Sequence, residues 1–337
     1  MINGGTQKLV RVWGYANKKS GETLAMKLQQ LRYVYEVARH NLNVSATADA
    51  LYTSQPGVSK QIRLLEDELG IQIFTRSGKH LVDITPAGRQ ILDVATRVLN
   101  DAQVIKDIAK DYAHPNAGTL RLGACPLAAR HFLPGVLQNF IKEFDKAHLM
   151  MRQGEEGHFH EWLDMGEVDI IVSLRPISSP LLVSLPCARW NYGWMTKQSK
   201  TRNGEPLLVF AADKEAEELL HHALPSDKSN QQWLLVSSDA TVIKTYIRQG
   251  WGTGLLPYIS YDAEHDKDMA IHACPESFPS GYFYFNYRRD LHWRAFLQGF
   301  ARCVSPILSL ELLEKAAELK HTAEQLSLVD ELQIPLH

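Results

Sequence analysis

The sequence predicts an α/β protein with an N-terminal winged helix-turn-helix, a long linker helix and a second domain of alternating strands and helices. Three observations lead to this prediction. Short helical patterns and a hairpin pattern precede residue 85, an apolar repeat of about 3.5 residues occupies residues 85–114, and strand-like and helix-like segments alternate after residue 118. A chain of 337 residues is also long enough for two domains, at roughly 100–200 residues each.

The composition excludes several classes of protein. Hydrophobic residues make up 45% and charged residues 22%, which is typical of a folded globular chain and unlike a disordered one. We find neither an apolar stretch long enough to cross a membrane nor a secretion signal, so we expect a cytoplasmic protein without membrane contact. The cysteines lie far apart, without a C-x-x-C pair, and are predicted to be reduced thiols: Cys125, Cys187, Cys274 and Cys303.

Residues 1–25 show no helical or strand period and contain four glycines and an excess of positive charge. We expect a flexible extension. A second interpretation, in which Met26 is the natural start of the protein, stays open.

Residues 26–84 carry the helix-turn-helix pattern. Apolar residues at helical spacing begin at Leu28, and a second short helix is predicted to start at the N-cap Ser45. A third helix is capped by Ser54, has Pro56 in its first turn and ends at Gly70. The tight turn between the second and third helices is the one that a helix-turn-helix requires.

A hairpin follows the third helix over residues 71–84. Its two apolar ends enclose the polar tip Arg76-Ser77-Gly78-Lys79. Two cations beside a glycine suit a wing that lies along a phosphate backbone.

The third helix has the polarity of a recognition helix. Val58, Ile62, Leu65 and Leu69 form its buried face, which leaves polar and basic side chains outward at the N-terminal half. Glu66, Asp67 and Glu68 lie at the other end, where phosphate would repel them. Residues 26–89 hold eight Lys or Arg and six Asp or Glu, a net charge of +2, so we expect specific, dimeric binding to double-stranded DNA. The predicted DNA contacts are Ser54, Gln55, Pro56, Ser59, Lys60, Arg63, Arg76 and Lys79.

Residues 85–114 are predicted to form one linker helix, capped by Thr85. Apolar residues at alternating steps of four and three favour a narrow seam against a partner helix. The alternative is an amphipathic helix that covers the core of its own domain. The predicted dimerisation residues are Ile91, Ala95, Val98, Ala102 and Ile105.

Residues 118–309 alternate between strands and helices, which predicts an α/β domain with a largely parallel sheet. Sheets of this kind bind ligands at the carboxyl ends of their strands, where helix N-termini offer free N–H groups. Residues 310–337 are predicted to form a helical tail.

The run from Met26 to Gly88 resembles the LysR-type transcriptional regulators, most clearly in Ser54-Gln55-Pro56 and Thr85-Pro86-Ala87-Gly88. Met26 to Tyr33, Asn41 to Ser45 and Asp239 to Tyr246 resemble the CysB-like branch of that family. The resemblance implies a dimerising linker helix, a two-lobed effector-binding domain similar to periplasmic binding proteins, and homodimers or homotetramers on operator DNA. It also implies control of sulfur-acquisition genes by a small-molecule co-inducer, and RNA polymerase is a candidate partner.

The first turn of the second domain departs from the CysB-like pattern, because Cys125, Pro126, Leu127 and Ala128 stand where that branch has hydroxyl side chains. Pro126 also lacks an N–H donor. We therefore expect the pocket in the same place with a changed ligand, which is anionic or contains sulfur. Arg175 is predicted either to supply charge to an anion or to form a surface ion pair. The predicted effector contacts are Cys125, Pro126, Leu127, Ala128, Leu174, Arg175 and Gly252.

Other motifs carry little chemistry. His158 and His160 lie on different faces of a predicted helix and lack a third ligand, so we expect no metal. Two roles for Cys125 are considered: a redox or catalytic cysteine, and a small side chain that lines the pocket. We expect no cofactor and no enzymatic activity. The alternatives are a family member with a repurposed pocket or constitutive activity outside sulfur metabolism, and a solute-binding or enzymatic α/β protein.

Overall fold

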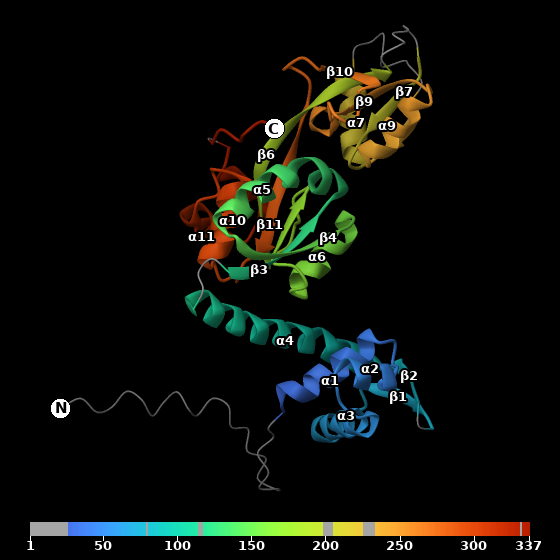
Figure 1. Cartoon of the computed structure of the whole chain (residues 1–337), viewed down its shortest axis with the longest axis vertical. Helices are drawn as coiled ribbons and strands as arrows, with labels where there is room; N and C mark the ends of the chain where they lie inside the picture. The colour runs from blue at the N-terminus through green and yellow to red at the C-terminus, as the bar shows by residue number, and fades with distance from the viewer. Residues whose placement is uncertain (1–25, 79, 114–116, 198–204, 225–232, 331) are drawn as a thin grey trace, which may run out of the picture. The chain divides into compact units, whose positions relative to one another are not determined.

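The computed structural model describes residues 26–337 except 79, 114–116, 198–204, 225–232 and 331 (Figure 1). The predicted extension 1–25 and the wing residue Lys79 therefore lie outside the described residues. The chain divides into two compact units, with the boundary between Ala102 and Gln103, inside helix α4 (Pro86–Ala113). Among the described residues, no helix is long and apolar enough to cross a membrane.

The first unit is a winged helix-turn-helix, as predicted. It consists of α1 (Leu28–Arg39), α2 (Val44–Ala50), α3 (Gln55–Leu69), β1 (Phe74–Ser77), β2 (His80–Ile84) and the first part of α4. Ser54 caps α3 by accepting a hydrogen bond from the Gly57 N–H, and Gly70 ends the helix with φ +68°. The predicted cap of α2 was wrong: Asn43, not Ser45, accepts the hydrogen bond from Ala46.

The core of this unit forms where α1, α3 and α4 meet. Val34 and Val37 of α1 pack with Val58 and Ile62 of α3 in one buried cluster. The cluster also includes Ala95 of α4. The first part of the linker helix therefore belongs to the helix-turn-helix domain.

The second unit has two α/β lobes built on one curled sheet, in the strand order β4-β3-β5-β11-β6-β9-β7-β8 with β10 beside β6. Its strands are β3 (Ala117–Ala124), β4 (Lys146–Gln153), β5 (Ile170–Ser173), β6 (Leu182–Lys197), β7 (Leu207–Phe210), β8 (Trp233–Ser237), β9 (Thr253–Pro257), β10 (Met269–Ala273) and β11 (Ser280–Arg288). Its helices are η1 (Ala128–Phe132), α5 (Leu133–Glu143), α6 (Glu156–Asp164), α7 (Lys214–Ala223), α9 (Ala240–Arg248), η2 (Tyr258–Ser260), α10 (Ala295–Val304), α11 (Leu310–Glu318) and α12 (Thr322–Ser327).

Strand β6 connects the two lobes (Figure 1). Its first part, residues 182–191, pairs with β11 beside β5, and its last part pairs with β9 and β10 of the second lobe. The pairs of β3 with β4 and β5, and of β7 with β8 and β9, are parallel, whereas the pairs made by β6 and β11 are antiparallel. The prediction of a largely parallel sheet was wrong, because it missed this long antiparallel strand.

A buried amide fixes the register at the start of this connection. Asn286 of β11 is fully buried, and its Nδ2 donates to Ser173 Oγ (2.8 Å) and to the Ile171 carbonyl (3.1 Å). Its Oδ1 accepts from Ser184 Oγ of β6 (2.6 Å). A shift of β11 by one residue would leave these buried polar groups unpaired, so the amide ties β5, β6 and β11 together.

We expect Gly88→Ala to destabilise the first unit by about 1–3 kcal/mol, because a Cβ at Gly88 would lie 2.1 Å from the Ile73 carbonyl oxygen. Gly135→Ala is the matched control. Gly135 also stands third in its helix, but a Cβ there meets nothing within 4 Å, so alanine should stabilise by about 0.5–1 kcal/mol. Hydrogen exchange of peptides from residues 28–102 measures the first effect. Exchange at the wild-type rate in Gly88→Ala would contradict the tight contact.

Candidate DNA-reading surface and effector site

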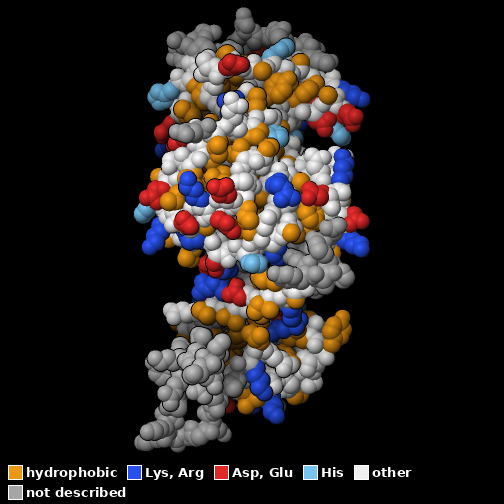
Figure 2. Space-filling view, turned by 90° about the vertical axis from the view of Figure 1, so that its left-hand side faces the viewer, with side chains coloured by type: hydrophobic (Ala, Val, Ile, Leu, Met, Phe, Trp, Pro, Cys, Tyr) orange, Lys and Arg blue, Asp and Glu red, His pale blue; other side chains and the backbone are white. Residues whose placement is uncertain are grey.

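Helix α3 presents its predicted contact residues to solvent at its N-terminal half. Gln55, Pro56, Lys60 and Arg63 are exposed and Ser59 is half-buried, while Val58, Ile62 and Leu65 are buried. Leu69, predicted to be buried, is 39% exposed. On the face in Figure 2, Lys and Arg side chains of the second unit are interspersed with Asp and Glu. On α3, the exposed Lys60 and Arg63 supply positive charge locally in a chain whose net charge is -2.

Glu66, one of the acids at the C-terminal end of α3, holds the wing. Its side chain is buried; Oε1 accepts from the N–H groups of Ile73 (2.9 Å) and Phe74 (3.1 Å), and Oε2 accepts from the Arg76 guanidinium (2.7 Å). These partners come from the wing segment, which folds back after Gly70, so the pattern of the helix alone does not predict them. Arg76, a predicted DNA contact, thus has a carboxylate partner within its own domain.

The predicted dimerisation residues fall into two groups. Ala95 is 1% exposed, and Ile91 and Val98 pack partly against the same core, so this stretch covers its own domain. Ala102 is half-buried and Ile105 is 69% exposed. The first part of the apolar repeat therefore covers the core of its own domain, which was one of the two alternatives, and Ile105 further along is exposed.

The predicted effector turn lies between β3 and η1 and meets the end of β5. Cys125, Leu127, Ala128 and Leu174 are buried, and the Cys125 N–H donates to the Val172 carbonyl (3.0 Å). Pro126 is half-buried at the same turn, and Arg175 follows Leu174 directly.

Gly252 does not lie with this group. Its Cα approaches Pro206 at the start of β7, so closely that a Cβ would lie 2.0 Å from the Pro206 carbonyl oxygen. Arg175, by contrast, meets the second lobe at Asp213, beyond the opposite end of β7. The glycine is needed for the approach of two chain segments.

Burial raises the pKa of the Cys125 thiol to about 12, which outweighs the lowering by backbone hydrogen bonds at the helix start. The thiol is therefore neutral at pH 7. A neutral buried thiol is a poor nucleophile and a poor target for oxidants, which favours a structural Cys125.

Two sets of ion pairs connect the lobes. Arg175 donates to both carboxylate oxygens of Asp213 (2.5 and 2.6 Å), and Glu215 lies 3.4 Å from the same guanidinium. On η1, Arg130 contacts Thr241 and lies 3.7 Å from Asp239 at the start of α9. Of the two alternatives for Arg175, the structure thus gives it the ion pair.

The surroundings of Arg175 are acidic. Its hydrogen bonds lower the pKa of the Asp213 carboxyl, whereas burial and the neighbouring Asp213 raise the pKa of Glu156. Two carboxyl groups, of Asp213 and Glu215, therefore contact one guanidinium, and Glu156 lies near enough for both Arg175 and Asp213 to affect its pKa. A further anion at this point would meet repulsion from all of them.

An aromatic cluster, which the sequence analysis did not identify, lies on the strands that connect the lobes. Phe132 of η1 stacks on Phe283 of β11 at 4.8 Å between ring centroids. Trp190 of β6 packs against Tyr192 (5.0 Å) and Phe210 (5.9 Å). The Trp190 Nε1–H is buried and has no hydrogen-bond partner among the described residues. All five rings are buried, so the cluster is part of the core where the strands of the two lobes meet.

Both units match a known family. Residues 28–89 match the family described as bacterial regulatory helix-turn-helix protein, lysR family, and residues 113–306 match the LysR substrate binding domain. The chain belongs to the LysR family. Like its relatives, it is a DNA-binding transcriptional regulator and not an enzyme.

The relatives of this LysR-family regulator extend over nearly the whole chain. The HTH-type transcriptional regulator CysB of Haemophilus influenzae is 35% identical over 88% of this chain and 95% of that protein. CysB of Burkholderia cenocepacia is 33% identical over 90% and 100%, and SsuR of the same organism is 33% identical over 72% and 83%. The predicted CysB-like branch is thereby confirmed.

Solved structures share the two-unit architecture. A full-length OxyR variant from Pseudomonas aeruginosa has a TM-score of 0.61 at 21% identity, covering 89% of this chain and 97% of its own. Full-length CbnR complexed with target DNA has a TM-score of 0.61 at 20% identity, covering 83% and 99%. These similarities support the fold.

The histidines weighed as metal ligands have other neighbours. His158 stacks on Trp162, and His160 lies 3.2 Å from Ser179 Oγ. Among the described residues, no group of His, Cys, Asp and Glu is arranged to hold a metal ion.

We expect Glu66→Ala to weaken DNA binding and to reduce its dependence on salt. The variant removes the acceptor for two buried N–H groups, at a cost of about 1–3 kcal/mol each, and so releases the wing that carries predicted phosphate contacts. Anisotropy titrations over a range of salt, with a duplex selected from a random pool by the wild-type protein, measure both quantities. Asp67→Ala, at an exposed neighbour, is the control. Wild-type affinity in Glu66→Ala would show that the wing needs no such anchor.

Proposed function

We propose that this LysR-family regulator binds operator DNA as a homodimer or homotetramer and controls sulfur-acquisition genes in response to a small molecule. The similarity to the regulators CysB and SsuR supports the proposal of sulfur-acquisition genes. The exposed N-terminal half of α3, with Lys60 and Arg63 free of carboxylate partners among the described residues, carries the proposal of DNA binding. Gln55 and Ser59 would read base edges.

Assembly would use the exposed part of α4. Ile105 is 69% exposed on a helix of 28 residues, which is long enough for a partner helix to pack along it. Two such dimers would form the homotetramer, and contact with RNA polymerase would follow from binding upstream of a promoter.

The effector site that we propose lies between the lobes, at the turn of Cys125 to Ala128, the end of β5 and the aromatic cluster. The turn offers buried apolar groups and a neutral thiol, and Arg175 is already bound to Asp213. Both features favour an organic effector with an apolar body over a bare anion such as sulfate. Trp190 Nε1–H would donate to its acceptor group.

An effector can act only by binding one arrangement of the lobes more tightly than another. The pairs of Arg175 with Asp213 and of Arg130 with Asp239 connect the lobes through side chains of the protein itself. This observation supports a second candidate, in which the regulator is active constitutively and the ion pairs replace the co-inducer.

We expect Lys60→Ala to weaken binding to the selected duplex and to reduce the slope of log affinity against log salt by about one, because one phosphate contact would be lost. Lys142→Ala, at an exposed lysine of α5 in the second unit, should leave both values unchanged. Anisotropy titrations at several salt concentrations measure the slope. An unchanged slope in Lys60→Ala would remove Lys60 from the phosphate contacts.

We expect uncharged sulfur metabolites or organic sulfonates to raise the melting temperature more than sulfate, thiosulfate or acetylserines do. At a hundred times its dissociation constant, an effector adds about 2.7 kcal/mol, which a thermal melt resolves. Asp213→Asn, which frees Arg175, should increase the response to sulfate. A wild-type response to sulfate as large as the best organic response would refute this view of the pocket, and silence across the panel would favour the constitutive candidate.

A further inference from the structure

The C-terminal segment covers the edge of β6 in the first lobe at two points. Gln325 Oε1 accepts from the Ser184 N–H (3.0 Å), and its Nε2 donates to the Leu182 carbonyl (3.3 Å). Further along, the Arg189 N–H donates to the Pro335 carbonyl (2.7 Å), and the His337 N–H donates to the Arg189 carbonyl (2.9 Å).

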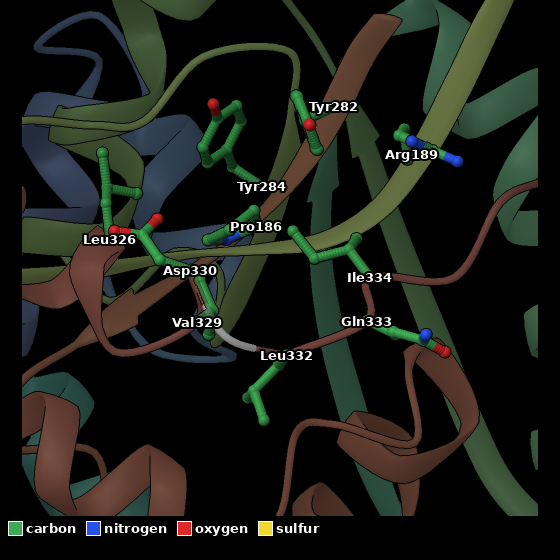
Figure 3. Close-up of a pocket in the computed structure, with 10 residues that line it drawn as sticks. All are labelled: Pro186, Arg189, Tyr282, Tyr284, Leu326, Val329, Asp330, Leu332, Gln333 and Ile334. Atoms are coloured by element: carbon green, nitrogen blue, oxygen red, sulfur yellow. The ribbon is translucent and has the colours of Figure 1, made fainter. Parts of the chain in front are cut away.

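The segment leaves β6 between these two points, and a pocket of about 670 Å³ lies there (Figure 3). Pro186 stands at this stretch of the edge and has no N–H, so the gap leaves no backbone donor of that residue unpaired. The volume falls within the range of about 300–1,000 Å³ that is usual for small-molecule sites. The pocket lies on β6 and β11 beside the tail, and none of its lining residues belongs to the effector turn or the aromatic cluster.

The lining combines an apolar floor with two separate charges. The apolar side chains are Pro186, Leu326, Val329, Leu332 and Ile334, and the polar ones are Arg189, Tyr282, Tyr284, Asp330 and Gln333. Figure 3 shows Arg189 on β6 and Asp330 on the tail at opposite sides of the pocket, with Tyr282 between them.

Neither charge is used within the described part of the chain. Arg189 Nε is buried without a hydrogen-bond partner there, and no ion pair joins Arg189 to Asp330 or to another described residue. This distinguishes Arg189 from Arg76, Arg121 and Arg175, whose guanidinium groups all lie on carboxylates. A buried donor without a partner costs about 1–3 kcal/mol in general, which a ligand that accepts from it would recover.

We propose that this pocket binds a small zwitterion, an amino acid or dipeptide with an apolar side chain. Its carboxylate would accept from Arg189, its ammonium group would lie against Asp330, and its side chain would contact the apolar floor. An opposite pair of fixed charges that do not neutralise each other selects a molecule that carries both. Such a ligand would clamp the tail onto the strand that connects the lobes.

The pocket is close to the interlobe ion pair as well. Tyr284 lines the pocket; burial raises the pKa of its phenol, and the nearby Arg175 lowers it in part. The proposed site is separate from the proposed effector site, and variants can tell the two apart.

The first test is a thermal melt of the full chain with each L-amino acid that has an uncharged side chain, and with Leu-Leu, followed by calorimetric titration of the best binder. L-Leucine is compared with 4-methylpentanoate, which lacks the ammonium group, and with 3-methylbutylamine, which lacks the carboxylate. We expect binding of the zwitterion and a Kd at least about tenfold higher for either analogue.

Arg189→Met and Asp330→Asn should each raise the Kd about tenfold or more, while the melting temperature without ligand stays near the wild-type value, because neither side chain has a partner to lose among the described residues. Arg302→Met, at an exposed surface pair with Glu143, is the matched control and should bind as the wild type does.

Three results would overturn the proposal: no shift from any zwitterion, equal binding of L-leucine and its two analogues, or wild-type binding by both pocket variants. Loss of binding in Asp213→Asn together with full binding in Arg189→Met would place the ligand between the lobes instead. That result would contradict this inference and leave the proposed effector site standing.

Discussion

The second unit depends on one constraint: a single strand of 16 residues, β6, must belong to both lobes. Residues 182–191 are held by β11 and its buried Asn286, and residues 192–197 are held by β9 and β10. Beside this strand, side chains also join the lobes directly, Arg175 with Asp213 and Arg130 with Asp239.

Local patterns in the sequence predicted most elements, because caps and breakers act over a few residues. Ser54 and Gly70 bound α3, and Asp213 begins α7 by accepting from the Ala216 N–H. Strand β6 was not predicted from the sequence, for a physical reason. It is buried on both faces over most of its length and contains Pro186, so it shows neither the alternation of a surface strand nor an unbroken run of strand-forming residues.

The site was harder to predict than the fold, because its contacts join residues that are far apart in the chain. Helical periodicity describes Glu66 only within its own helix. It does not include the wing segment, whose N–H groups donate to the Glu66 carboxylate. Arg175 and Asp213 are 38 residues apart, and only the folding of two lobes brings them to 2.5 Å. The turn at Cys125 was located from the family resemblance. The aromatic cluster around Trp190 could not be predicted in this way, because it forms only when β6 pairs with β11.

Signal transfer to the linker helix has a physical route within the second unit. Asp107 of α4 is buried and pairs with Arg121 of β3 (3.2 Å), and the same guanidinium reaches Asp169 (3.3 Å). Burial raises the pKa of Asp169 even though Arg121 lowers it, so the carboxylate is costly to leave unpaired. The end of α4 is thus bound to the first lobe through charges that separate only at high cost. These contacts fix the end of α4 to the first lobe, so this end of the helix and that lobe form one body.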